Sequence, residues 1–132
     1  MSEFSRLDRV RFGDLDAMQH LNNVEFLRFF ETARIAYLEE LIPDFSPTER
    51  GAFGYVVGEN HIAYRAPAGF GDEIRTTVRP RDPEGSTWRF DLEMHRESDG
   101  TLLAEGFTVL VGFDYDTEES ADIPDSVQKL LG

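Results

Sequence analysis

Asp16 and the residues after it form the segment of this chain best suited to chemistry. Residues 10–23 read VRFGDLDAMQHLNN and lead directly into the apolar pattern of a helix. The first backbone N–H groups of a helix lack intrahelical partners and lie at the positive end of its dipole. They can polarise an acyl carbonyl while a nearby carboxylate attacks it or activates water. This pairing predicts acyl transfer.

A single long helix must position that site. Apolar residues recur over most of the circumference of residues 22–42, so we expect a helix there that is enclosed by other structure. Asn22 is suited to be its N-cap with Glu25 at the third helical position, and Pro43 is expected to end it.

After this helix the hydrophobic period changes to two, which indicates strands. One run places Trp88, Phe90, Leu92 and Met94 on one face. A second run is expected to do the same with Leu103, Phe107, Val109, Val111 and Phe113, after a turn at residues 98–100. Further strands are expected over 7–12, 53–65 and 73–79, and a short helix after Pro124. The pattern predicts a single α+β domain, residues 1–132, whose antiparallel sheet curls around the helix.

Composition excludes several classes of protein. There are no cysteines, which rules out disulfides, thiolate catalysis and cysteine zinc sites. A net charge of −13 argues against a nucleic-acid partner, because phosphate binding needs a basic surface. No stretch approaches the roughly 20 apolar residues of a membrane span, and the N-terminus lacks a signal-peptide pattern. We therefore expect a cytoplasmic protein with no membrane partner.

Four motifs in a fixed order support a family resemblance. They are the pair Asp14 and Asp16, the loop His20-Leu21-Asn22-Asn23, the helix segment Phe30-Glu31-Thr32-Ala33-Arg34, and Tyr64-Arg65-Ala66-Pro67-Ala68 followed by Gly71-Asp72. Together they resemble the hotdog-fold acyl-CoA thioesterases of the 4-hydroxybenzoyl-CoA thioesterase-like family. The match runs from about residue 7 to residue 113, almost the whole chain.

That resemblance implies a hotdog fold, a curved antiparallel sheet wrapped around one long central helix, with protomers joined as a homodimer or homotetramer. It implies hydrolysis of an acyl-CoA thioester to a free acid and coenzyme A without a cofactor. Asp16 matches the family's catalytic carboxylate, which is a nucleophile or a general base. Asn23 matches the residue whose backbone N–H forms the oxyanion hole. From the residues alone, Asp16 is as well explained as a turn cap.

Other side chains are candidates for substrate binding and have simpler alternatives. His20 and Asn22 contact the substrate or hold the loop; a metal role for His20 is disfavoured, because no recognised ligand spacing accompanies it. Glu31 is placed near the substrate or paired with Arg34, although a second branch of hotdog enzymes takes its catalytic carboxylate from this helix. Glu59 and His61 share a strand face that could look toward the pocket.

Arg65 is the candidate for the phosphates of coenzyme A, with Arg75, Arg79 and Arg81 as alternatives, because a guanidinium binds phosphate bidentately. Solvated arginines on a strand are the plainer explanation. We expect Phe26, Phe30, Tyr55 and Val57 to line the acyl tunnel.

Two other functions stay open at this stage. A hydratase or dehydratase acting on acyl thioesters would share the fold, but the His-Phe-Pro run typical of such relatives is missing. A non-catalytic acyl-CoA binding protein is the other alternative, and an intact Asp16 counts against it.

Overall fold

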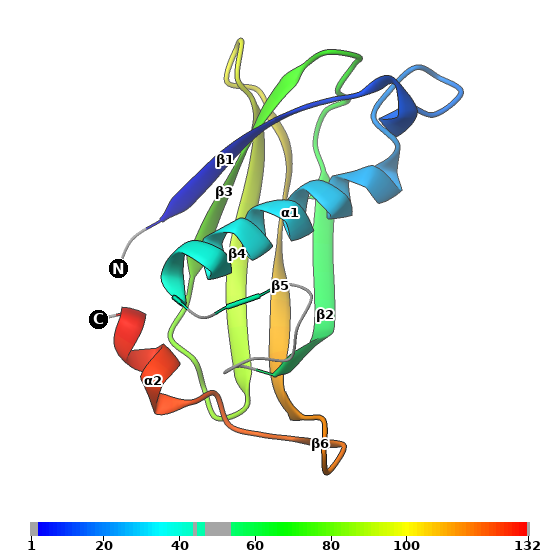
Figure 1. Ribbon diagram of the computed structural model, residues 1–132. Helices are drawn as coiled ribbons and strands as arrows, with labels where there is room; N and C mark the ends of the chain where they lie inside the picture. The colour runs from blue at the N-terminus through cyan, green and yellow to red at the C-terminus, as the bar shows by residue number, and fades with distance from the viewer. Residues whose placement is uncertain (1–2, 44, 47–53, 132) are drawn as a thin grey trace.

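A six-stranded antiparallel sheet and one long helix make up the fold (Figure 1). The computed structural model describes residues 3–43, 45–46 and 54–131. The elements in chain order are β1 (Phe4–Arg9), the 3-10 turn η1 (Phe12–Asp14), α1 (Asn23–Leu41), β2 (Tyr55–Tyr64), β3 (Glu73–Pro80), β4 (Thr87–Arg96), β5 (Leu102–Asp114), β6 (Glu119–Ser120), α2 (Asp125–Gln128) and η2 (Lys129–Leu131). The sheet order is β1-β3-β4-β5-β2, and the short β6 pairs with β5.

Helix α1 begins and ends where its local signals indicate. The Asn22 side chain accepts a hydrogen bond from the Val24 N–H at 3.0 Å, which makes Asn22 the N-cap. At the other end the Ile42 N–H donates to the Leu38 carbonyl and closes the helix before Pro43. The predicted helix is therefore confirmed to within one residue at each end.

The expected enclosure of α1 is present on the side of the helix that faces the sheet. Figure 1 shows α1 lying across one face of the sheet, with strands on that side only. On its other side Val24 is 60% exposed and the Glu31 side chain is 61% exposed. An apolar pattern over most of a helix therefore does not by itself show that a single chain buries the helix on every side.

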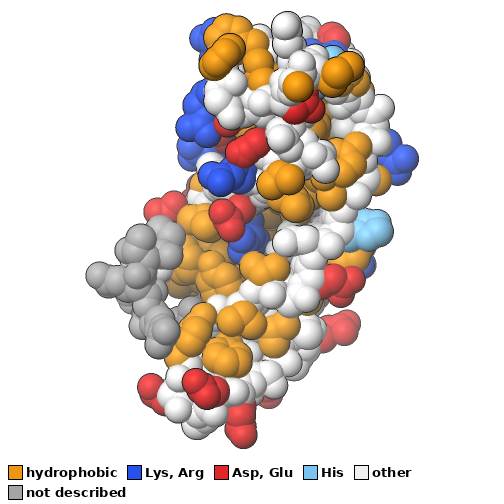
Figure 2. All heavy atoms as spheres, turned by 90° about the vertical axis from the view of Figure 1, so that its right-hand side faces the viewer, with side chains coloured by type: hydrophobic (Ala, Val, Ile, Leu, Met, Phe, Trp, Pro, Cys, Tyr) orange, Lys and Arg blue, Asp and Glu red, His pale blue; other side chains and the backbone are white. Residues whose placement is uncertain are grey.

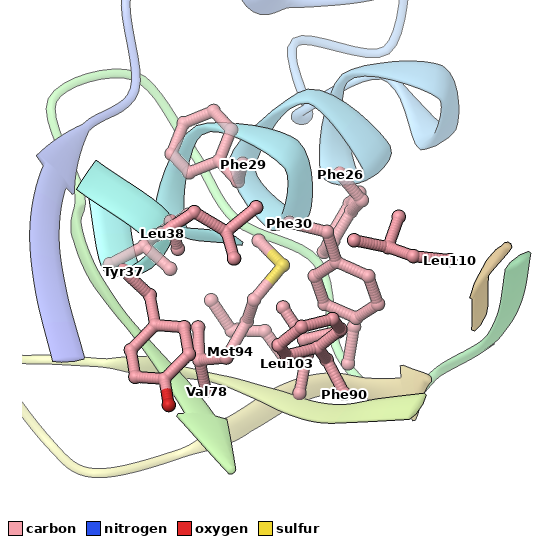
Figure 3. Packing of buried hydrophobic residues seen from close by; sticks show 14 of the residues in the cluster. Phe26, Phe29, Phe30, Tyr37, Leu38, Val78, Phe90, Met94, Leu103 and Leu110 are labelled. Atoms are coloured by element: carbon pink, nitrogen blue, oxygen red, sulfur yellow. The ribbon is translucent and has the colours of Figure 1, made fainter. Parts of the chain in front are cut away.

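The core fills the space between α1 and the sheet (Figure 3). Phe26, Phe30 and Leu38 point from the helix toward the strands and are almost completely buried. Trp88, Phe90, Leu92 and Met94 of β4 are all buried, which confirms the alternation predicted for that strand. The predicted α+β class is confirmed: a curved antiparallel sheet packs around one long helix, which is the hotdog arrangement.

The face assigned to β5 is a second correction. Thr108 and Leu110 face the core, while Phe107 and Val109 lie on the outer face of the sheet. The register shows why, because Leu110 stands opposite Trp88 and Thr108 opposite Phe90. Apolar residues occupy both sides of β5, so its sequence pattern does not identify the buried side.

A β-bulge at Gly58 sets the direction of the side chains of β2. Val57 pairs with Leu110 while Glu59 pairs with the next residue, Val109, so Gly58 is the extra residue. A Cβ atom on Gly58 would lie 2.7 Å from the Val111 side chain, which favours glycine there. After the bulge the even-numbered residues of β2 face α1. Residue 53, where this strand was expected to begin, lies outside the described residues.

The N-terminal strand ends earlier than predicted, at Arg9, and β1 pairs with β3 from Phe4 to Arg9. The chain then enters η1 instead of continuing as a strand to Phe12. At the C-terminus the predicted short helix is present as α2. No helix in the described residues has the length and apolarity that a membrane crossing requires.

Candidate active site

The loop between β1 and α1 is closed into a compact unit at the upper right of Figure 1. Leu15 and Leu21 form an isolated antiparallel bridge, and the Leu21 N–H also donates to the Ala68 carbonyl. Bridged residues of this kind have Cα atoms about 5 Å apart. Asp16 lies opposite His20 on the hairpin side of the bridge, and α1 starts from the other side, where the Asn22 N–H donates to the Asp14 carbonyl. One short closed loop therefore carries both the carboxylate and the helix N-terminus.

Asp16 is exposed and anchors its own loop. Its Oδ1 accepts hydrogen bonds from the backbone N–H groups of Met18 at 2.9 Å and His20 at 3.3 Å. The Asp16 backbone adds bonds from its N–H to the His20 carbonyl and from the Gln19 N–H to its own carbonyl. The turn-capping role is therefore present. It uses Oδ1, and Oδ2 has no hydrogen bond with another described residue.

The backbone N–H of Asn23 is a free donor at the first position of α1. No hydrogen bond from it is found within residues 3–43, 45–46 and 54–131. The Asn23 carbonyl accepts a hydrogen bond at 2.8 Å from the hydroxyl of Tyr64, which packs edge-on against the buried Phe26. Tyr64 thus fixes the start of the helix from β2, a role that the sequence analysis did not assign to it.

Asp14 braces the loop from inside. The Asp14 carboxylate is buried and accepts hydrogen bonds from the Arg11 backbone at 2.8 Å and the Arg11 guanidinium at 3.1 Å. Burial is the largest single influence and opposes ionisation, but the bonds and charge of Arg11 together lower the pKa of Asp14. The Asn22 N–H donates to the Asp14 carbonyl. Asp14 belongs to the 3-10 turn η1 and not to a strand, so Asp14 and Asp16 share no strand face.

His20 and Asn22 take part in the loop chiefly through backbone and capping contacts. The His20 backbone bonds to Asp16 and bridges to Gly69. Its imidazole is exposed, and no contact of the ring with another described residue is found. Asn22 is the N-cap. Their predicted contact with substrate stays a prediction.

A groove of about 330 Å³ runs along α1 on the side that faces β2. Figure 2, turned so that the β2 side faces the viewer, shows hydrophobic side chains gathered over the middle of this face. The groove is lined by Val24, Leu27, Arg28, Phe30, Glu31, Arg34, Val57, Asn60 and Thr108. Of the four residues expected to line an acyl tunnel, Phe30 and Val57 line this groove. Phe26 packs under Tyr64, and Tyr55 stacks on Phe45.

Asn60 was not predicted to line the groove, because the bulge at Gly58 changes which side chains of β2 face α1. From β2, the Asn60 side chain accepts a hydrogen bond of 2.6 Å from the buried hydroxyl of its β5 neighbour Thr108. Strict alternation from Val57 would put Glu59 and His61 on this side. A glycine inside a strand pattern is the signal that could have indicated the change of face.

Glu59, His61 and Arg65 are therefore not brought together with Asp16 and Asn23. His61 stacks on Phe107 on the outer face of the sheet, with ring centroids 5.2 Å apart. Arg65 is paired there with Glu105 at 3.0 Å. The structure corrects the expectation that Glu59 and His61 look toward the same pocket as Asp16.

The alternative phosphate-binding arginines also lie on the outer face, in ion pairs. Arg75 pairs with Glu97 at 2.6 Å, Arg79 with Glu93 at 3.0 Å, and Arg81 with Asp91 at 2.7 Å. Phosphate binding by any of them would have to displace a carboxylate. No group of three His, Asp or Glu side chains suited to a metal ion occurs within the described part of the chain.

Comparison with known proteins adds independent findings. The model of the thioesterase-like superfamily matches residues 10–131. The long-chain acyl-CoA thioesterase FadM of Escherichia coli K12 is 27% identical over 123 residues, which cover 93% of this chain and 92% of that protein.

Two solved structures show how far the likeness extends. A thioesterase from Thermus thermophilus, complexed with coenzyme A and Zn, is 31% identical with a TM-score of 0.84, covering 96% of this chain and 90% of that one. Slr0204, a 1,4-dihydroxy-2-naphthoyl-CoA thioesterase from Synechocystis, has a TM-score of 0.88 at 20% identity, covering 98% and 96%. At that identity the second likeness concerns the fold alone.

Proposed function

The chain belongs to the thioesterase-like superfamily, and from that premise we propose that it is an acyl-CoA thioesterase that uses the Asp16 carboxylate and the Asn23 N–H. The products are a free acid and coenzyme A. The chemistry needs no metal or bound cofactor, so we expect turnover to survive treatment with a chelator.

The observation that carries this proposal is the unpaired Asn23 N–H at the start of α1, next to the loop that presents Asp16. A thioester carbonyl bound to this N–H gains most when negative charge develops on its oxygen in the transition state. The groove along α1 begins at Val24, directly after this donor. It is a suitable place for the acyl chain.

Asp16 can act in either of two ways. Its carboxylate can attack the carbonyl carbon and expel the coenzyme A thiolate, leaving an anhydride that water then hydrolyses. Alternatively it can take a proton from a water molecule that attacks the same carbon. Both routes require a charged, accessible oxygen, and Oδ2 is suited to this because the loop contacts use Oδ1.

The similar proteins support the substrate class. FadM of Escherichia coli is named as an acyl-CoA thioesterase, and the Thermus thermophilus thioesterase is complexed with coenzyme A. Both are similar to this chain over more than nine-tenths of its length.

The test separates the chemical role of Asp16 from its role in the turn. Asp16→Asn keeps an Oδ1 acceptor for the Met18 and His20 N–H groups but removes the charged oxygen. Release of thiol from a panel of acyl-CoAs should fall by about 10²–10⁴ in kcat, the usual size of general-base effects. Thermal unfolding should change little.

A matched control is available in the β5–β6 turn. Asp114 accepts hydrogen bonds from the N–H groups of Asp116 at 2.9 Å and Thr117 at 3.3 Å, nearly the same turn geometry as Asp16. Asp114→Asn should retain activity. Equal kcat in the two variants would contradict the assignment of Asp16. An inactive wild type on every ester would favour the acyl-CoA binding or hydratase alternatives.

We also propose that two copies join along β2. Within the described residues β2 pairs only with β5, so its other edge has unpaired backbone groups. Exposed Val57 and Tyr64 lie on this strand, and exposed Val24 lies beside it on α1. Light scattering should give at least twice the monomer mass, and proline in place of Ile62 should lower it.

A further inference from the structure

Arg34 is a buried cation on the wall of the groove between α1 and β2. Its side chain is only 5% exposed and lines the groove together with Asn60 and Thr108. It comes from the helix segment that carries the family resemblance, but the proposed reaction does not use it.

The guanidinium of Arg34 is incompletely paired. Its Nη2 lies 3.8 Å from Glu31, whose own side chain is 61% exposed, and the guanidinium lies 6.0 Å from the centre of the Tyr55 ring. Its Nη1 is buried and has no hydrogen-bond partner among the described residues. Burying a guanidinium costs free energy unless acceptors surround it, and no described residue supplies an acceptor to Nη1.

The surroundings of Arg34 are consistent with this. Burial is the main influence that raises the pKa of the Tyr55 hydroxyl, and the charge and hydrogen bonding of Arg34 oppose it. The charge of Arg34 therefore acts on the Tyr55 hydroxyl. Among the described residues that line the groove, only Glu31 offers charged oxygens, and Glu31 faces solvent.

The buried guanidinium of Arg34 lies at the far end of the groove from the reactive donor. From Asn23 to Arg34 the helix rises by about 16 Å, at 1.5 Å per residue. Val24 and Leu27 line the part next to Asn23, whereas Glu31 and Arg34 follow one and two turns after Leu27. Arg28 also lines the near part, but its side chain is 72% exposed and paired with Glu25 at 3.0 Å. An acyl chain whose carbonyl binds the Asn23 N–H would first meet apolar walls and then a guanidinium.

We propose that Arg34 is a specificity residue that binds a terminal carboxylate on the acyl chain, so that the preferred substrates are coenzyme A thioesters of dicarboxylic acids. This inference rests on the proposed thioesterase function. A carboxylate suits the site because its two oxygens match the guanidinium fork. The hydroxyl of Thr108 and the amide of Asn60 are further polar groups along the same wall.

The test compares substrates that differ only at the far end of the chain. Hexanoyl-, decanoyl- and dodecanoyl-CoA are each paired with the ω-carboxy thioester of the same length, and kcat/KM is measured for both. We expect the wild type to favour the ω-carboxy substrate by about ten- to hundredfold at its best length, the effect of a hydrogen-bonded charge. The ratio should be greatest for chains long enough to reach Arg34.

Three variants locate the effect. Arg34→Met should abolish the preference, and Asn60→Asp, which places a fixed carboxylate in the groove, should reduce it. Arg75→Met is the matched control, because Arg75 is exposed and paired with Glu97 on the other face of the sheet; it should keep the wild-type ratio. Asn60 lies at an exposed strand position, so its variant tests the inference even if Arg34→Met fails to fold.

Binding of non-hydrolysable thioether analogues of the same pairs separates this inference from the proposed reaction. If no thioester is hydrolysed but the ω-carboxy analogue binds more tightly through Arg34, the thioesterase proposal fails and the assignment of Arg34 stands. If the wild type prefers plain acyl chains at every length, the inference is overturned. It is likewise overturned if Arg34→Met weakens both members of each pair equally.

Discussion

The arginines on the two sides of the sheet are held in opposite ways. On the outer face Arg65, Arg75, Arg79 and Arg81 are each within 3.0 Å of a carboxylate, with side chains 40–57% exposed. On the helix side Arg34 is 5% exposed, and the nearest carboxylate oxygen among the described residues is 3.8 Å away. The four exposed arginines are thus well paired with carboxylates. Within the described part of the chain, the buried Arg34 is not.

This difference shows where charge is structural and where it is available for function. Exposed pairs gain little from each other because solvent and salt screen them. A buried guanidinium with an unpaired N–H donor gains free energy when it binds an acceptor, because the cost of its desolvation is then offset. Arginine count along the sequence is therefore a poor guide to ligand binding, and burial combined with pairing is a better one.

The largest expected difference in the free energy of unfolding is between a ring buried under α1 and a ring on the outer face of the sheet. Phe30→Ala removes an almost completely buried ring under α1 and should lower the free energy of unfolding by about 3–5 kcal/mol. Phe107→Ala removes a half-buried ring that stacks on His61, with the Arg89 guanidinium 3.8 Å from its centre, and should cost about 1 kcal/mol. Urea unfolding of both variants measures the difference. Similar losses would mean that the outer face is also covered by protein in solution.

An intermediate effect is expected at Asp14, where a buried carboxylate is well paired. Its folded-state pKa is below the ordinary value of 3.8, so its charge stabilises the fold above that pH. This contribution should be lost as the pH falls through the folded pKa, because the unfolded chain takes up the proton first. Asp14→Asn should cost about 1–3 kcal/mol at neutral pH and much less near pH 3. Urea midpoints at the two pH values test this, and an equal loss at both would exclude the charge as the cause.

The smallest effect is expected for the ion pairs on the outer face. Arg75→Met breaks the contact with Glu97 and should change the free energy of unfolding only slightly, because solvent screens the pair. Added salt should shrink even that difference, because the pair is exposed. A loss that is larger and insensitive to salt would show that this face is buried in the assembled protein and would remove the contrast with Arg34.

Local signals in the sequence predicted the parts of the fold that local interactions determine. The ends of α1 follow from Asn22 and Pro43, and the buried face of β4 follows from its alternation. The loop with Asp16, Asn22 and Asn23 was found because its residues are close together in the chain. Contacts between distant residues could not be predicted in this way, such as Tyr64 with Asn23 or Arg79 with Glu3.

The other wrong predictions have one physical origin: which alternate residues of a strand face the helix and which face the outer side of the sheet. A strand that is apolar on both sides, as β5 is at Phe107 and Leu110, does not indicate which side is buried. In β2 one extra residue reverses the direction of all those that follow. Asn60 was therefore missed, while Glu59 and His61 were expected on the wrong face. Arg34 was treated as a structural partner because sequence alone gives no measure of unsatisfied hydrogen bonds.

Because of the bulge at Gly58, a change in the length of β2 would alter the lining of the groove without any change of residue type. Deleting Gly58 would turn Glu59 and His61 toward α1 and turn Asn60 and Tyr64 away. The loss of this one residue would replace the neutral side chains that β2 places in the groove with ionisable ones. It would also remove the hydrogen bond from Tyr64 to the start of α1. Relatives with strands one residue shorter at this point would then differ in specificity despite similar sequences, and alignments that ignore the gap would pair side chains from opposite faces.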